Sequence, residues 1–190
     1  MTVISRALPL VEVVGRTIEG VAYSYAQPSD VSDDGGETSY FEQILKGADT
    51  KTIRDRAGGT FPLLIWHSRT SNAGHFPPQS IGEVVFEPGP EHLGYRAVLD
   101  RSKLADEMLE LVADETARDV SVSYNPLRDV EGVHDGRLLV SRAEIALKEL
   151  SLAPTGTGQH DGAKVLVMRA TDAHPDRNDA LIRLRLLNLR

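Results

Sequence analysis

Three strand-like segments each place one reactive side chain among apolar residues: His67, Ser121 and Glu149. Nucleophilic acyl transfer uses these groups, because a histidine takes the proton of the attacking hydroxyl and a carboxylate holds the imidazole in place. The three residues are far apart in the sequence, so only folding could bring them together. The sequence therefore predicts a catalytic site of Ser121, His67 and Glu149, provided that the three segments converge.

The histidine and the serine also have ordinary structural interpretations. His67 ends the apolar run 60–66, so it fits an inert, hydrogen-bonded histidine at a sheet edge equally well. Ser121 and Ser123 share one face of the expected strand, with apolar residues on the other face. Two serines on a solvated face are common, and the two-residue period does not say which of them is the nucleophile.

The carboxylate has an ordinary interpretation as well. A charged Glu149 within an apolar strand costs free energy unless it is paired or reaches water. A salt bridge to Arg142 or Lys148 would satisfy it without any catalytic role. Each of the three candidates is thus a weak signal on its own, and only the combination points to catalysis.

No other chemistry has a comparable signal, and we expect neither a metal nor another cofactor. The spacing of His67, His75 and His92 matches no metal-ligand motif, and acidic residues do not cluster around these histidines. The chain has no cysteine, which excludes disulfides, thiolate metal sites and a cysteine nucleophile. The glycine-rich stretches lack the lysine and hydroxyl residue of a phosphate-binding loop; they lie at 35–36, 58–59 and 156–158.

The overall composition indicates a globular protein that works in the cytoplasm where it is made. The chain has 190 residues, of which 41% are hydrophobic and 26% charged, enough for one domain with a buried core. A net charge of −7 argues against a nucleic-acid partner. No apolar run approaches the roughly 20 residues of a membrane helix, and residues 1–10 do not resemble a secretion signal.

The C-terminal end differs in character from the rest. We expect a domain over residues 1–170 and a basic, apolar tail over residues 171–190. Residues 177–190 contain four arginines and one aspartate, so the rest of the chain carries a net charge of −10. Within the tail, Arg183 and Arg185 alternate with apolar residues, which fits an edge strand or an amphipathic helix. The tail could pack on its own acidic domain or on a second copy.

The pattern of short apolar runs predicts an α+β fold: a mainly antiparallel sheet or barrel with a few flanking helices. Helices are expected at 39–47, where Ser39 and Glu42 have capping-box spacing, and at 104–112, with Ser102 as the cap. Loops or connections are expected at 27–38, 50–59, 68–79, 128–136 and 155–162. Strands are expected within 11–25 and at 60–66, 80–86, 93–99, 120–124, 138–152 and 165–168.

Taken in order, these segments resemble the prohead maturation proteases of HK97-type tailed phages, which share the herpesvirus assemblin fold. The resemblance spans roughly residues 16–168. The matching motifs are Gly20-Val21-Ala22-Tyr23, then Leu64-Ile65-Trp66-His67 with Ile81-Gly82, then Val120-Ser121-Val122-Ser123-Tyr124, and finally Leu147-Lys148-Glu149-Leu150-Ser151-Leu152. A predicted helix lies between the second and third motifs, as in the family.

The resemblance implies a serine endopeptidase in which Ser121 is the nucleophile, His67 the base and Glu149 the orienting carboxylate. Two backbone amides or an arginine, for which Arg142 is one option, would hold the oxyanion. The implied substrates are scaffold, segments of the major capsid protein, and the protease itself. The implied setting is an assembling procapsid in the host cytoplasm, with a homodimer or larger homo-oligomer by analogy with assemblins.

Three departures from the family pattern keep an alternative open. Ser123 replaces a glycine after the nucleophile, Ser68 replaces an acidic residue after the histidine, and 153–158 replaces a Pro-Ala-Asn-Pro turn. The alternative is a catalytically disabled member of the same fold that acts as a capsid assembly or scaffold component. A β-rich binding module unrelated to phage is a further alternative.

Overall fold

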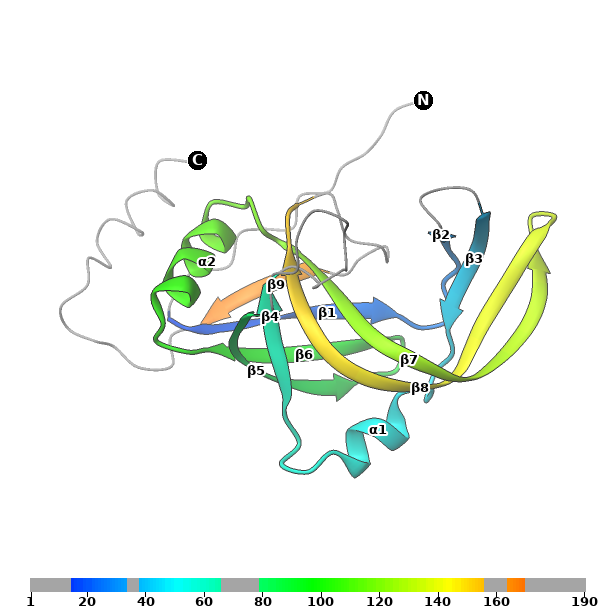
Figure 1. The fold of residues 1–190 in the computed structure, drawn as a ribbon, viewed down its shortest axis with the longest axis horizontal. Helices are drawn as coiled ribbons and strands as arrows, with labels where there is room; N and C mark the ends of the chain where they lie inside the picture. Colours follow the sequence, from blue (N-terminus) through cyan, green and yellow to red (C-terminus); the bar gives the residue numbers. More distant parts are fainter. Residues whose placement is uncertain (1–14, 34–37, 66–78, 156–163, 170–190) are drawn as a thin grey trace.

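Nine strands form one sheet in this computed structural model, which describes residues 15–33, 38–65, 79–155 and 164–169 (Figure 1). Two short helices accompany the sheet. The elements are β1 Thr17–Ser24, β2 Ser29–Asp33, β3 Thr38–Ile44, α1 Thr50–Asp55, β4 Phe61–Ile65, β5 Gln79–Pro88, β6 His92–Leu99, α2 Lys103–Ala113, β7 Asp119–His134, β8 Arg137–Ala153 and β9 Lys164–Arg169.

The strand order is β2-β3-β8-β4-β5-β6-β1-β9-β7, with an additional pairing of β7 to β8. Strand β8 is the hub of the sheet, because β7 follows it along one edge while β3 and β4 pair with different parts of its other edge. The β3–β8 and β4–β8 pairings are parallel and the others are antiparallel. The predicted α+β class and the mainly antiparallel sheet are confirmed.

The sheet is open and is not a closed barrel. Strand β9 follows β1 over several pairs, but it meets β7 only where Lys164 pairs with Asp119. One pair is too short a ladder to close the sheet on itself. Of the two predicted forms, a sheet or a barrel, the sheet is correct.

Alternating apolar residues on β5 and β6 build the centre of the core. On β6, Leu93, Tyr95, Ala97 and Leu99 are buried while the residues between them are exposed or half-buried. The Phe61 and Phe86 rings meet edge to face at 5.0 Å between centroids. Gly82 is required by close packing, since a Cβ placed there would lie 2.1 Å from the carbonyl oxygen of Val98.

Helix α2 forms where the sequence predicts it. The hydroxyl of Ser102 accepts a hydrogen bond from the Ala105 amide at 3.2 Å, which caps the first turn. Ala105, Met108 and Val112 lie on its buried face. Helix α1, which is about one and a half turns long, lies within segment 50–59, where we expected only a connection.

Two predictions for the N-terminal third are wrong. The helix expected at 39–47 is a strand, because β3 is held between β2 and β8 by backbone pairing. The capping-box glutamate, Glu42, instead points its carboxylate at Arg142 and Tyr124. The loop expected at 27–38 contains β2. Pairing with distant strands overrides local helix propensity here.

The longest feature is a hairpin of β7 and β8 that extends well past the core (Figure 1). We call residues 125–134 of β7 and 137–144 of β8 the arm. Its tip is a two-residue turn in which Asp135 and Gly136 have φ of 48° and 77°, the positive values that a tight hairpin needs. The connection expected at 128–136 is therefore mostly strand. Among the described residues, no helix has the length and apolarity to cross a bilayer.

Candidate functional site

The register of β7 against β8 places the predicted nucleophile next to the predicted carboxylate. Ser121 pairs with Ser151, and Ser123 pairs with Glu149. Paired residues on antiparallel strands point to the same face, so these four side chains share one face of the hairpin. Val120 and Val122 of β7 point the other way into the core, as expected. The structure thus brings Ser121 and Glu149 together.

This polar face is more deeply buried at the Ser121–Ser151 pair than at Glu149. Ser121 is 6% exposed and Ser151 is completely buried, whereas Glu149 is half-buried. The Ser151 hydroxyl donates a hydrogen bond of 3.3 Å to Oε1 of Glu149. A buried hydroxyl that donates to a carboxylate limits the rotamers that the carboxylate can adopt. Ser151 therefore holds Glu149 on the face that carries Ser121.

The strand that leads to His67 lies on the opposite edge of β8. Leu64 pairs with Ser151 and Ile65 pairs with Leu152. Strand β8 therefore separates the end of β4 from Ser121, which lies on β7. His67 itself lies outside the described residues, as do His75 and residues 171–190. The structure therefore places two of the three predicted site residues and the strand that precedes the third.

Ser121 and Glu149 are diagonal neighbours on one face of the hairpin, offset by one pair. The backbone positions of such neighbours lie about 7–8 Å apart, within reach of long side chains. In a triad, an imidazole bridges the hydroxyl and the carboxylate with a hydrogen bond at each end. An imidazole that joins Ser121 to Glu149 would have to enter this face of the hairpin.

Arg142 is not placed to hold an oxyanion at Ser121. It lies about 23 Å along β8 from Glu149, at roughly 3.3 Å per residue. Its guanidinium is already committed, donating to Glu42 at 2.7 Å, to Asp129 at 2.7 Å and to the Tyr40 hydroxyl at 3.4 Å. The alternative salt bridge between Arg142 and Glu149 is excluded on the same grounds.

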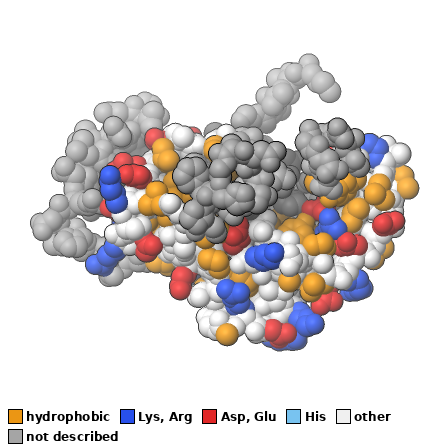
Figure 2. All heavy atoms as spheres, in the orientation of Figure 1, with side chains coloured by type: hydrophobic (Ala, Val, Ile, Leu, Met, Phe, Trp, Pro, Cys, Tyr) orange, Lys and Arg blue, Asp and Glu red, His pale blue; other side chains and the backbone are white. Residues whose placement is uncertain are grey.

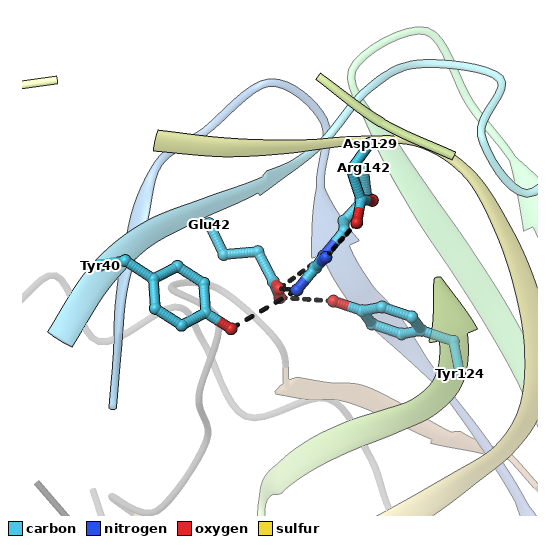
Figure 3. A network of polar contacts seen from close by, with 5 residues as sticks. All are labelled: Tyr40, Glu42, Tyr124, Asp129 and Arg142. Atoms are coloured by element: carbon cyan, nitrogen blue, oxygen red, sulfur yellow. Dashed lines mark hydrogen bonds and ion pairs between the residues drawn. The ribbon is translucent and has the colours of Figure 1, made fainter. Parts of the chain in front are cut away.

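Sequence reasoning missed this polar network at the base of the arm (Figure 3). Besides Arg142, Glu42 accepts a hydrogen bond from the Tyr124 hydroxyl. The side chains of Arg142 and Glu42 are only 12% and 7% exposed. Burial alone would lower the pKa of Arg142, but the adjacent Glu42 carboxylate raises that pKa above its usual value. Burial and Glu42 likewise raise the pKa of Tyr124, so its hydroxyl stays protonated and donates.

A second buried carboxylate lies next to α1. Asp49 is fully buried and accepts hydrogen bonds from the hydroxyls of Tyr23 at 2.9 Å and Tyr25 at 2.8 Å. Burial, together with the Asp49 charge, raises the pKa of Tyr23 well above its usual value. These contacts tie β1 to the segment before α1, and their role is structural.

No group of three or more metal-ligating side chains is present in the part of the chain that the structure describes. Comparison with known proteins found no match to this chain among family models, curated proteins or solved structures.

Proposed function

We propose that this protein is a serine endopeptidase of the prohead maturation type, which cleaves scaffold, major capsid protein segments and itself in an assembling procapsid. The main support is the position of Ser121 and Glu149 on one face of neighbouring strands, one pair apart. The sequence resemblance supplies the capsid substrates and the family. The enzyme would use Ser121, His67 and Glu149, with no cofactor.

The reaction would run in two steps. Ser121 Oγ bonds to the substrate carbonyl carbon while His67 takes the hydroxyl proton, and His67 then gives that proton to the leaving amine as the C–N bond breaks. Water next attacks the acyl-enzyme ester with His67 as the base, which releases the new carboxyl end and restores Ser121. Glu149, held by Ser151, would keep the imidazole oriented.

This proposal makes a strict demand on the chain after β4. Ile65 pairs with Leu152, whose side chain is buried in the core. An unbroken strand would put residue 67 on the same face as Ile65, opposite Ser121. Catalysis therefore requires the backbone to leave regular strand geometry directly after Ile65, so that the imidazole turns toward Glu149.

A fluorophosphonate probe, which labels activated serines, tests the assignment. We expect labelling of the wild type to be lost in Ser121→Ala and to fall at least 100-fold in His67→Gln and Glu149→Gln. The matched control is Ser123→Ala, on the same strand and face, which should keep labelling. Loss in Ser123→Ala with retention in Ser121→Ala would reassign the nucleophile, and no labelling in any form would reject the enzyme.

The probe experiment should be done on protein co-expressed with capsid protein and scaffold, with intact masses read in parallel. Cleavage fragments that disappear in Ser121→Ala support the proposed substrates. Labelling without fragments would keep the hydrolase and reject the capsid substrates.

One observation favours the alternative of a disabled enzyme that serves as an assembly component. Ser121 is 6% exposed, and Ser123 occupies the same face where the resembled family has a glycine. A side chain there crowds the space in which an oxyanion would form. The variant Ser123→Gly separates the two functions: a gain of labelling from a silent wild type supports the disabled component.

A further inference from the structure

The outer edge of the arm is an open strand. Along β7, residues 125–133 are all exposed, and within the described residues β7 has a neighbour on this edge only at Asp119. The apolar side chains there are unusually exposed: Leu127 at 58%, Val130 at 52% and Val133 at 76%. Figure 2 shows hydrophobic side chains on the surface at the right-hand end of the molecule, where the arm lies. An exposed strand edge with apolar side chains is a template for another strand.

Only the outer part of this edge is regular. The pairing of β7 with β8 shifts between 123 and 124 and twice more between 126 and 129, and irregularities of this kind discourage strand addition. From Asp129 to His134, six consecutive pairs run without a shift. Residues 129–134 therefore form a straight edge of six residues next to the tip.

Contacts with β3 hold this edge in place. The Arg137 guanidinium lies 4.2 Å above the Phe41 ring and forms an ion pair with Asp30 of β2 at 2.9 Å. The His134 ring contacts Phe41 edge to face at 4.7 Å. The edge is thus preformed, and an added strand would not have to order it.

The two faces of the edge differ in charge. Asp129 pairs with Arg142 and Glu131 with Val140, so both acidic side chains lie on the face that carries the Arg142 network. Val130 and Gly132 lie on the other face. A complementary strand would alternate basic and apolar residues.

Residues 182–186, Ile-Arg-Leu-Arg-Leu, have this alternation. In an extended segment, Arg183 and Arg185 would lie on one face and the apolar residues on the other. An antiparallel register with Leu184 beside Val130 puts Arg185 beside Asp129 and Arg183 beside Glu131. This register covers residues 129–132 of the straight edge and brings Leu184 against Val130. Glu131 gains an arginine, and Asp129, which already pairs with Arg142 at 2.7 Å, gains a second one.

We propose that residues 182–186 of a second copy of this chain add as a strand to the arm, with residues 182–185 beside residues 129–132. The reach of the chain favours a second copy. Measured along the backbone, the path from Arg169 back along β9 and out along β7 to Glu131 is about 56 Å at roughly 3.3 Å per residue. The segment between Arg169 and Arg183 extends to at most about 50 Å, which is shorter than this path.

Reciprocal exchange would give a closed two-fold dimer with two such strand additions. The proposal does not depend on the proteolytic function, because no residue of the candidate site takes part. It predicts an association that weakens with salt, since opposite charges line one face of the added strand.

Analytical ultracentrifugation of the full chain tests this with a charge exchange. We expect the wild type to be a dimer at micromolar concentration. Glu131→Arg alone and Arg183→Glu alone should each weaken the dimer at least tenfold, and the two changes together should recover most of the affinity, because they exchange the charges of one pair. The matched control is Glu83→Arg on β5, also exposed, which should leave the dimer unchanged.

Removal of residues 177–190 should give a monomer that keeps the wild-type circular dichroism spectrum. A truncated protein that remains dimeric would overturn the proposal and point to pairing of two β7 edges instead. A wild type that is monomeric throughout, or a charge exchange without recovery, would also overturn it.

Discussion

Ser121 and Ser151 face each other across the β7–β8 ladder, and the Ser151 hydroxyl reaches along its own strand to Glu149 at 3.3 Å. Ser151 is therefore the link between the predicted nucleophile and the predicted carboxylate. Its side chain is fully buried, whereas the acceptor Glu149 is half-buried.

Replacing Ser151 by alanine should slow catalysis more than it affects folding. Loss of the hydrogen bond frees Glu149 to adopt other rotamers, and we expect the labelling rate of Ser121 to fall about threefold to tenfold. The free energy of unfolding should change by less than about 1.5 kcal/mol, the usual net value of one hydrogen bond. Probe kinetics and urea unfolding measure the two effects. Equal labelling rates in Ser151→Ala and wild type would show that Ser151 does not position Glu149.

Replacing Arg142 by methionine should destabilise the protein by about 3–5 kcal/mol, because it leaves the buried Glu42 carboxylate without its cation. Urea unfolding measures this loss. Arg54→Met is the matched control: Arg54 is exposed on α1 and pairs only with its neighbour Asp55 in a surface ion pair. Its replacement should leave the urea midpoint close to that of the wild type, because exposed ion pairs contribute little to stability. Similar costs for the two variants would contradict the structural role of the network.

Replacing Gly82 by alanine should destabilise the sheet by about 1–3 kcal/mol or more, because the new Cβ would collide with the Val98 carbonyl. Gly132→Ala provides the comparison, since nothing lies within 4 Å of a Cβ placed there and its φ is not positive. Thermal melts of the two variants should differ by several degrees. A Gly82→Ala variant as stable as Gly132→Ala would show that β5 and β6 are further apart than described.

Alkaline pH should unfold the protein through its buried tyrosines. Burial raises the pKa of Tyr23, Tyr25, Tyr95 and Tyr124 in the folded state, each with desolvation as the largest cause. Above the unfolded pKa of about 10, the unfolded chain loses protons that the folded chain retains. Stability is therefore complete below pH 10 and falls as pH rises beyond it, by up to about 1.4 kcal/mol per pH unit for each tyrosine.

Urea midpoints between pH 8 and pH 11 measure this slope. Tyr23→Phe should be less stable than wild type at pH 8, because Asp49 loses one of its two hydroxyl donors. It should also lose less stability between pH 10 and pH 11. An unchanged slope would mean that Tyr23 ionises in the folded protein.

Local signals in the sequence predicted the elements that depend on local interactions. Helix α2 has its cap at Ser102 and its apolar side at helical spacing, and both are present. The strand expected at 93–99 and the shared face of Ser121 and Ser123 are confirmed. A strand alternates its side chains between two faces whichever strands it pairs with, so this pattern can be seen in the sequence. Segment 39–47 failed because its capping and apolar spacing are compatible with a helix, and only the distant β8 makes it a strand.

The polar networks could not be predicted from the sequence. Glu42 and Arg142 lie 100 positions apart, and nothing in the spacing of either residue marks the other as its partner. The sequence did not predict the burial of Ser121 either, because a serine on the polar face of a strand is usually solvated. On the β8 side of the arm, the strand expected at 138–152 is present. The β7 side was not predicted, because its charged residues and Gly132 are typical of turns, whereas pairing with β8 makes these residues a strand.

Strand β8 runs without interruption for 17 residues from the tip of the arm to the end of the candidate site. One backbone therefore carries both Glu149 and the Arg142 network. A partner strand that binds the arm and changes the twist of β8 would therefore also move Glu149 relative to Ser121, although the two sites lie about 23 Å or more apart at roughly 3.3 Å per residue.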